Sequence, residues 1–228
     1  PHFGDEFKVM GLSSLGKPTL LPILRELVRE DPKFGFRLNL EAFPLHRRPL
    51  TFYIEDSQPK INPLFQVGLL TQMLGIPPRK PTDKLTEQHA DLAKSVQVRF
   101  EEVATHVLKQ LYARFPTSIL GLAGGCAHNS VWVGKIPSLT PFKKVLVAPA
   151  SHDAGIAVGA AIHASRVPIT VEAGSWSLLG PTESEDQKPV TAALGLTQKT
   201  FSSEQKLIQW LSEEIAEGKI IGLAKGRM

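Results

Sequence analysis

Two glycines separate an apolar run from a polar segment in SILGLAGGCAHNSVWVGK, residues 118–135. The apolar run 119–123 predicts a short strand, and the residues after Gly124 and Gly125 are compatible with a helix. Because glycine has no Cβ, its backbone adopts positive φ and lets a bulky group approach closely. A helix that begins just beyond offers unpaired N–H groups and a partial positive charge, which suit phosphate. The pattern therefore predicts either a phosphate-binding loop or a tight strand-to-helix turn without a ligand.

Asp153 belongs to a second candidate site, SHDAGIAVGAAIHA, residues 151–164. It follows a predicted strand, 145–148, and opens a predicted helix. Open α/β sheets bind ligands at the carboxyl ends of their strands, so the loops 124–129 and 151–155 are expected side by side at one sheet edge. The Asp153 carboxylate suits a hard cation beside a nucleotide phosphate. As the first residue of a helix it equally suits an N-cap.

Three more side chains near these loops have chemistry to offer. Cys126 is the chain's single cysteine, which excludes a disulfide within the chain and favours a reducing, cytoplasmic compartment. It adjoins the glycine pair, but no base accompanies it at a recognisable spacing, so a small buried thiol is expected rather than a nucleophile. His128 and His152 are either extra ligands near Asp153 or imidazoles that line a cleft.

The composition is that of an ordinary globular protein with a small positive charge. The 228 residues include 26 Lys and Arg against 22 Asp and Glu, a net charge of +4. The basic residues are scattered and aromatic residues make up only 7%, whereas nucleic-acid binders concentrate basic residues beside aromatic ones. We therefore expect a small anionic ligand and no nucleic acid. No apolar run has the length of a membrane span, so no membrane association is expected.

Both ends of the chain suggest a piece of a longer protein. Pro1 is not an initiator methionine, and GKIIGLAKGRM, residues 218–228, stops inside what the pattern predicts to be a strand-and-loop unit. We therefore expect a fragment that is inactive by itself.

The elements that must position these residues alternate between helix and strand. In chain order the sequence predicts a loop, a helix near 18–30, a pair of short strands within 33–63, a proline-rich connector, a long helix 86–114, a strand 119–123, a helix 127–136, a strand 145–148 and a helix from about Asp153. The long helix owes its prediction to an apolar stripe of Leu92, Val96, Phe100, Val103, Val107 and Leu111. This alternation is typical of an α/β layer with a largely parallel sheet.

The last third of the chain is predicted to contain a linker and one more helix. Residues 167–200 are rich in Gly, Pro, Ser and charge. A helix over 203–217 follows, with Ser202 or Ser203 as its cap and Gly218 as its end. The apolar residues after Gly218 predict a further strand.

The two candidate loops resemble a known family. GLAGGCAHN followed by VLVAPASHDAGIAVGAAIHA is similar to the second half of the actin-like ATPase (ribonuclease H-like) fold of sugar kinases, seventy-kilodalton chaperones and tRNA threonylcarbamoyl-transfer enzymes. More narrowly, it resembles the O-carbamoyltransferases that act on nodulation factors and on aminoglycoside or cephalosporin antibiotics. GDEFKVMGLSSLG (4–16), the long-helix segment 85–108 and GKIIGLAKGRM resemble further segments of that family, in the family's order.

The resemblance implies domains and site residues. Residues 1–170 would form an actin-like ATPase subdomain, and 171–228 a linker and the start of a YrdC-like carboxy-terminal domain. The residues implied to bind ATP are Gly124, Gly125, Asn129, Gly155, Glu6 and Lys8, although the last two equally suit a surface ion pair. Asp153 would bind a divalent metal, iron or magnesium. Arg227 would begin a pocket for carbamoyl phosphate.

The resemblance also implies a reaction. Carbamoyl phosphate is hydrolysed, its carbamate is adenylated by ATP, and the carbamoyl group moves to a hydroxyl of a sugar or natural product. No catalytic side chain is assigned, and a homo-oligomer is compatible with the family. The family's amino-terminal histidine pair and carboxy-terminal arginine motif do not occur in these residues, so half a nucleotide site is expected. Two alternatives stay open: another enzyme of the same fold, or a non-catalytic nucleotide-binding regulatory module.

Overall fold

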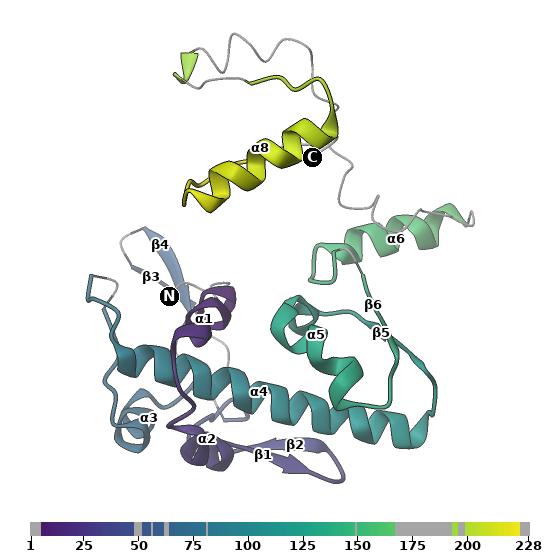
Figure 1. Cartoon of the computed structure of the whole chain (residues 1–228). Coiled ribbons are helices and arrows are strands. Elements are labelled where there is room, and N and C mark those ends of the chain that lie inside the picture. The colour runs from purple at the N-terminus through teal and green to yellow at the C-terminus, as the bar shows by residue number, and fades with distance from the viewer. Residues whose placement is uncertain are drawn as a thin grey trace. The chain divides into compact units, whose positions relative to one another are not determined.

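The computed structural model describes residues 6–47, 52–55, 57–61, 64–80, 82–148, 150–166, 193–195 and 199–223 (Figure 1). The chain divides into a first unit, residues 1–153, and a second unit, residues 154–228. The predicted domain boundary between residues 170 and 171 lies outside the described residues.

The first unit begins with two short helical elements where the sequence predicted a loop. Helix α1 (Glu6–Leu12) continues directly into the 3-10 turn η1 (Ser13–Leu15). Both pack against the long helix α4. The glycines and serines of this segment are weak helix formers, so packing on α4 overrides the local preference for a loop.

Helix α4 (Glu87–Arg114) is the longest helix of the described residues, and its prediction is confirmed. Thr86 and His89 form a reciprocal cap at its start. The predicted apolar stripe is wrong in part, because Val96, Val107 and Leu111 are exposed. The buried positions are Ala90, Ala93, Ser95, Gln97, Arg99, Thr105 and Leu108. Small and polar residues are buried because α1, η1, α2 and the first hairpin all contact this helix.

Two β-hairpins follow helix α2 along the chain. Helix α2 (Leu21–Leu27) ends sooner than predicted, because strand β1 (Val28–Asp31) pairs antiparallel with β2 (Gly35–Leu38). The turn between them is held by the Asp31 carboxylate, which accepts the N–H groups of Lys33 and Phe34, both at 2.8 Å. The second hairpin pairs β3 (Phe52–Glu55) with β4 (Gln58–Ile61). The two predicted strand segments therefore exist, each in its own hairpin.

A small apolar cluster links α2 to helix α3 (Val67–Leu74). Leu24, Leu27 and Ala42 are buried there, with leucines of α3 packed against them. Gly75, at φ +68°, ends α3, and an irregular connector then leads to α4.

The main core of the first unit surrounds a parallel strand pair. Strand β5 (Ile119–Leu122) pairs in parallel with β6 (Lys144–Val147), and the turn η2 (Gly125–His128) and helix α5 (Ser130–Leu139) form the crossover. The buried cluster joins α4, β5 and α5 through Leu108, Leu120, Trp132, Ile136 and Phe142. This parallel pair confirms the predicted α/β class and brings the loops after β5 and β6 to one edge.

Two helices lie in the described residues of the second unit. Helix α6 (Gly155–Ser165) begins at Gly155, two residues later than predicted. Helix α8 (Glu204–Ala216) confirms the prediction: the Ser203 hydroxyl accepts the N–H of Lys206, and Gly218 follows the helix at φ +82°. Residues 219–223 form no strand, so the predicted strand is wrong over these residues. None of the helices described here is long and apolar enough to cross a membrane.

Candidate functional site

The two predicted loops of the first unit lie side by side, as their topology required. Gly124 leaves β5 with φ +93°, a conformation that favours glycine. Its N–H donates to the Ser151 carbonyl at 2.6 Å. The His128 Nε2 atom lies 3.1 Å from the Ser151 hydroxyl. The rings of His128 and His152 contact each other with centroids 5.2 Å apart and planes tilted by 37°. The expectation of one shared sheet edge is therefore confirmed for residues 124–128 and 151–152.

The glycine pair exposes backbone to open space. A Cβ built on Gly124 or on Gly125 would meet no atom within 4 Å. Gly125 also begins η2, and the first N–H groups of a helical turn lack partners within that turn. An anionic ligand could therefore approach these two residues without displacing a side chain. The open space at the two glycines and the N–H groups at the start of η2 are together compatible with binding of a phosphate group.

Asn129 connects the glycine loop to two helices. Its Oδ1 atom accepts the N–H of Trp132 at 3.0 Å and so caps α5. The same oxygen accepts Nε2 of Gln97 at 3.0 Å, and Nδ2 of Asn129 donates back to Oε1 of Gln97 at 2.9 Å. The side chain thus positions the loop on α4. The sequence analysis missed this cap because it placed the helix start at residue 127, and the partner of Asn129 in α4 has no signal in the sequence.

Asp153 does not have the capping role that its position suggested. The N-cap residue of α6 is Ala154, and no side-chain hydrogen bond caps the helix. The N-cap prediction is therefore wrong, because Asp153 belongs to a turn over residues 150–154 and Ala154 stands between it and the first helical residue. Within the described part of the chain, no three His, Cys, Asp or Glu side chains form a group that could hold a metal ion.

Cys126 is exposed, which corrects the expectation of a buried thiol. It lies within η2, on the turn that carries the chain away from the sheet edge. Ser151, by contrast, is only 6% exposed and lies beneath this loop, in contact with His128. The sequence singled out the cysteine, but the buried polar side chain of these two loops is that of Ser151.

The other implied nucleotide residues have different positions. Glu6 and Lys8 are exposed on α1. This helix lies close to the residue after the loop, as the 4.0 Å distance between the Ser130 hydroxyl and the Met10 sulfur shows. Gly155 is the first residue of α6, in the second unit. Arg227 lies outside the described residues.

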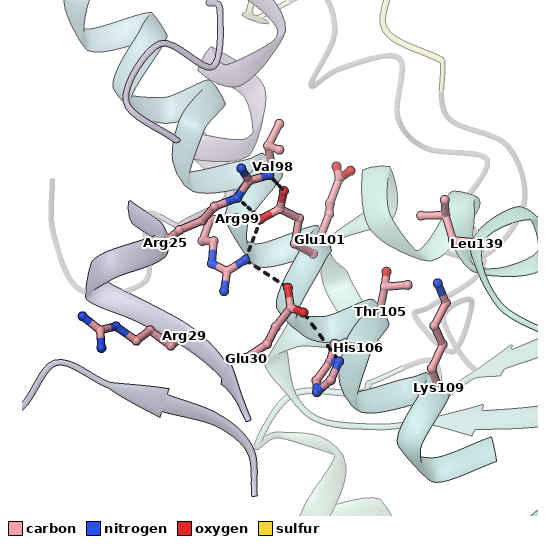
Figure 2. A pocket seen from close by; sticks show the side chains of 11 residues that line it. Arg25, Arg29, Glu30, Val98, Arg99, Glu101, Thr105, His106, Lys109 and Leu139 are labelled. Carbon is pink, nitrogen blue, oxygen red and sulfur yellow. Dashed lines mark hydrogen bonds and ion pairs between the residues drawn. The ribbon is translucent and has the colours of Figure 1, made fainter. Parts of the chain in front are cut away.

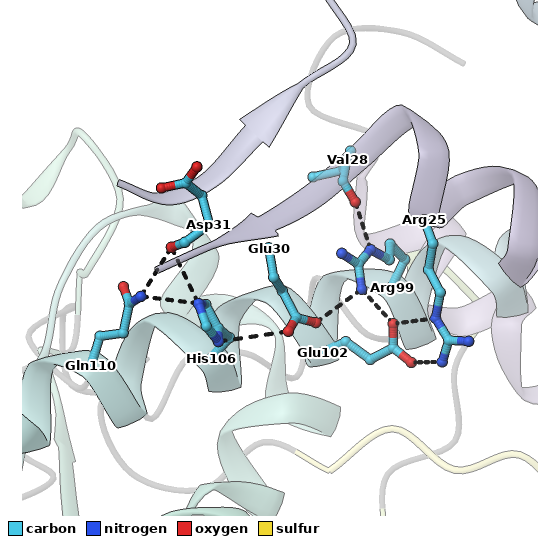
Figure 3. A network of polar contacts seen from close by, with 8 residues as sticks. All are labelled: Arg25, Val28, Glu30, Asp31, Arg99, Glu102, His106 and Gln110. Carbon is cyan, nitrogen blue, oxygen red and sulfur yellow. Dashed lines mark hydrogen bonds and ion pairs between the residues drawn. The ribbon is translucent and has the colours of Figure 1, made fainter. Parts of the chain in front are cut away.

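A second polar region lies along α4, where the helix lines a cavity together with α2 and β1 (Figure 2). A network of ion pairs forms its wall (Figure 3). Glu102 accepts hydrogen bonds from Arg25 and Arg99, and Arg99 also donates to Glu30 and to the Val28 carbonyl. The hydrogen bond from Arg25, followed by that from Arg99, outweighs burial and lowers the pKa of Glu102.

The first hairpin carries a similar carboxylate. The N–H of Phe34 and the guanidinium of Arg37 are the main causes of a lowered pKa of Asp31. The Asp31 carbonyl accepts from Gln110 at 2.9 Å and so fixes the hairpin to α4. Sequence patterns missed this region because its contacts between α4 and the segment from α2 to β1 join residues about 70 positions apart, as the 71-residue separation of Arg99 and Val28 illustrates.

Comparisons with known proteins show the family to which this chain belongs. The family model of the carbamoyltransferase N-terminus matches residues 2–162. The uncharacterized protein sll1178 of Synechocystis sp. is 29% identical over 233 residues, which cover 98% of this chain and 36% of that protein. The nodulation protein NolNO of Sinorhizobium fredii is 30% identical over 242 residues, covering 98% of this chain and 30% of that protein. The nodulation protein NolO of Bradyrhizobium diazoefficiens is 31% identical over 165 residues, covering 71% of this chain and 25% of that protein.

This chain therefore spans about a third or less of the length of these curated relatives, whose matched shares are 36%, 30% and 25%. The family match extends from α1 through both candidate loops and most of α6. Because it covers well over half of the chain, this chain belongs to the carbamoyltransferase N-terminus family.

Proposed function

We propose that this chain is part of an ATP-dependent O-carbamoyltransferase and that its glycine loop holds the nucleotide. In this reaction water releases carbamate and phosphate from carbamoyl phosphate, ATP adenylates the carbamate with loss of pyrophosphate, and the carbamoyl group passes to a hydroxyl with release of AMP. The acceptor is a sugar or another hydroxylated small molecule. The observation that carries the proposal is the open backbone at Gly124 and Gly125 in a member of this family.

The residues of the loop have distinct roles in this proposal. The N–H groups at the start of η2 donate to phosphate oxygens, and the absence of a Cβ at Gly125 leaves room for them. Asn129 acts indirectly, since its amide is engaged by Trp132 and Gln97 and holds the loop in place. As the resemblance implies, Glu6 and Lys8 on α1, and Gly155 at the start of α6, would also contact the nucleotide in the complete protein.

Asp153 would supply one carboxylate ligand to a divalent metal, iron or magnesium. Carboxylate oxygens suit both ions, and such a cation would neutralise phosphate charge. We further propose that β5, α5 and β6 belong to an actin-like ATPase subdomain. Residues 171–228 would form a linker and the start of a YrdC-like domain, in which Arg227 would begin the pocket for carbamoyl phosphate.

The nucleotide site is tested by adding one methyl group. The Gly125→Ala change places a Cβ where no protein atom lies within 4 Å, so the fold should be unchanged while bound phosphate is obstructed. We expect ATP affinity, measured by isothermal titration calorimetry, to fall at least tenfold. Gly134→Ala in α5 is the matched control, because its Cβ also meets nothing within 4 Å and it lies away from the loop. Equal ATP affinity in both variants would contradict the proposed site.

The reaction is tested in the complete gene product by measuring pyrophosphate release from ATP. We expect release only when carbamoyl phosphate is present, and loss of release in Asp153→Ala with ATP binding retained. If ATP binds but pyrophosphate never appears, the carbamoyltransferase proposal fails. A kinase or a catalytically silent nucleotide module would then be the better explanation.

A further inference from the structure

The second hairpin, β3–β4, exposes apolar side chains on both faces of β3 (Figure 1). The exposed fractions of Phe52, Tyr53 and Ile54 are 73%, 43% and 65%. Successive side chains of a strand point to opposite faces, so Phe52 and Ile54 lie on one face and Tyr53 on the other. A sheet of only two strands is marginally stable in water. The three consecutive apolar residues therefore indicate a strand that a further strand covers.

One edge of β3 offers its backbone groups to such a strand. In an antiparallel pair, residues that exchange two hydrogen bonds alternate with residues that exchange none. Pro59 has no N–H, so its pair with Ile54 is of the second kind. The same then holds for Phe52, two positions earlier. The N–H and C=O groups of Phe52 and Ile54 therefore point away from β4, and within the described part of the chain no third strand pairs with β3.

The outer edge of β4 is poorly suited to further pairing. The nitrogen of Pro59 faces that edge and carries no hydrogen, and proline is one of the residues by which proteins protect exposed sheet edges. Residues 52–54 of β3, by contrast, include neither a proline nor a charged residue. An incoming strand therefore finds one open edge on this hairpin, the edge of β3.

We propose that β3 pairs with β3 of a second copy of this chain, antiparallel and about a two-fold axis at Tyr53. In this register Phe52 of one copy lies opposite Ile54 of the other, and the two exchange both of their outward-facing hydrogen bonds. Tyr53 lies opposite Tyr53 of the second copy. Aromatic residues opposite β-branched or aromatic ones are favourable cross-strand pairs, and residues 52–54 bring no like charges together. One strand thus supplies both sides of a symmetric interface.

The assembly formed in this way is a closed dimer. The two hairpins make one sheet in the order β4–β3–β3–β4, so both β3 edges are used. Each outer edge is then a β4 strand, where Pro59 disfavours the addition of a third copy. The inference uses only this hairpin and not the proposed carbamoyl transfer, so either proposal can fail while the other holds.

Sedimentation velocity of the complete gene product, from about 1 µM to about 100 µM, tests the dimer. We expect the wild type to dimerise. Tyr53→Glu and Tyr53→Lys each place two like charges about 5 Å apart across the axis, so each should raise the dissociation constant at least about tenfold. An equal mixture of the two variants should dimerise again, because opposite charges then face each other. Phe34→Glu is the control: it adds the same charge at an exposed aromatic residue in the turn of the first hairpin and should leave the dimer intact.

A second variant tests the backbone pairing without adding a charge. Ile54→Pro removes an N–H that the dimer uses and the hairpin does not, so each dimer loses two hydrogen bonds and the dissociation constant should rise at least about fivefold. The proposal is overturned if the wild type is monomeric throughout the concentration range, since a strand from elsewhere in the complete protein would then be the better occupant of the edge. It is also overturned if any of the three variants dimerises as tightly as the wild type, or if the mixture of Tyr53→Glu and Tyr53→Lys stays monomeric.

Discussion

Among the described glycines, Gly16 makes the closest approach to another backbone segment, and replacing it with alanine tests that packing directly. A Cβ on Gly16 would lie 2.0 Å from the Ala90 carbonyl oxygen and 2.6 Å from the Asp91 nitrogen. These are backbone atoms of α4, so no side-chain rotation can relieve the overlap. The φ angle of Gly16 is −109°, which alanine adopts readily. The expected cost is therefore steric and not conformational.

The size of the effect follows from the contacts that fix this segment to α4. The N–H of Lys17 and the hydroxyl of Thr19 both donate to the Asp91 carboxylate, at 2.7 and 3.2 Å. The N–H of Leu20 donates to the Ser95 hydroxyl at 3.0 Å. To bring a 2.0 Å contact to the ordinary range of 3.4–4 Å, the segment must move away and break these bonds. At about 1 kcal/mol for each bond, we expect a loss of about 3 kcal/mol.

Urea unfolding followed by circular dichroism measures this loss. Gly11→Ala is the control, because a Cβ on Gly11 in α1 meets nothing within 4 Å. Alanine there should raise the free energy of unfolding by up to about 1 kcal/mol through helix propensity. If the free energy of unfolding of Gly16→Ala lies within about 0.5 kcal/mol of the wild-type value, which is about the usual error, the close approach of η1 to α4 is refuted.

Three further changes test the core, the loop and the ion-pair network. Phe142→Ala should lower the free energy of unfolding by about 3–5 kcal/mol, because the side chain is 1% exposed within the core of the parallel pair; a loss below about 1 kcal/mol in urea unfolding would contradict that packing. Asn129→Ala should cost about 1–2 kcal/mol through loss of the α5 cap and of the bonds to Gln97, and Asn129→Ser should recover part of it in the same assay. The pKa of Glu102 is lowered from 4.5, chiefly by Arg25, so its stabilisation is present above pH 4.5 and is lost as the pH falls through the lowered pKa. Glu102→Gln should therefore reduce the loss of stability between about pH 5 and about pH 3, where this carboxylate becomes protonated in the wild type. An unchanged pH profile would argue against the network.

Elements that carry their own local signals could be predicted from the sequence. Helix α4 has both an apolar repeat and a capping threonine, and α8 has Ser203 at its start and Gly218 beyond its end. Strand β1 was missed because leucine spacing extends to Leu27, and Val28 forms a strand only through its pairing with Leu38. Helix α1 was missed because its stability depends on α4, which is remote in sequence.

In the candidate site, too, features that follow from the order of strands and helices could be predicted, whereas those that depend on local turns or remote contacts could not. The adjacency of the two loops followed from the topology of parallel strands, which the alternation of elements already implied. The capping prediction for Asp153 failed because the start of α6 depends on where the preceding turn ends. The exposure of Cys126 depends on the 3-10 turn η2, and the bond between Asn129 and Gln97 joins residues 32 positions apart. Neither leaves a pattern in the sequence.

Two reciprocal hydrogen bonds between the amides of Asn129 and Gln97 join the glycine loop to α4. Each amide both donates to and accepts from the other, so a slide or rotation of α5 against α4 breaks both bonds together. Moving the loop away from α4 therefore costs both hydrogen bonds. While it is engaged, its thermal motion is coupled to that of a 28-residue helix about 42 Å long. A ligand at the glycine loop would thus meet a backbone that is anchored to this long helix.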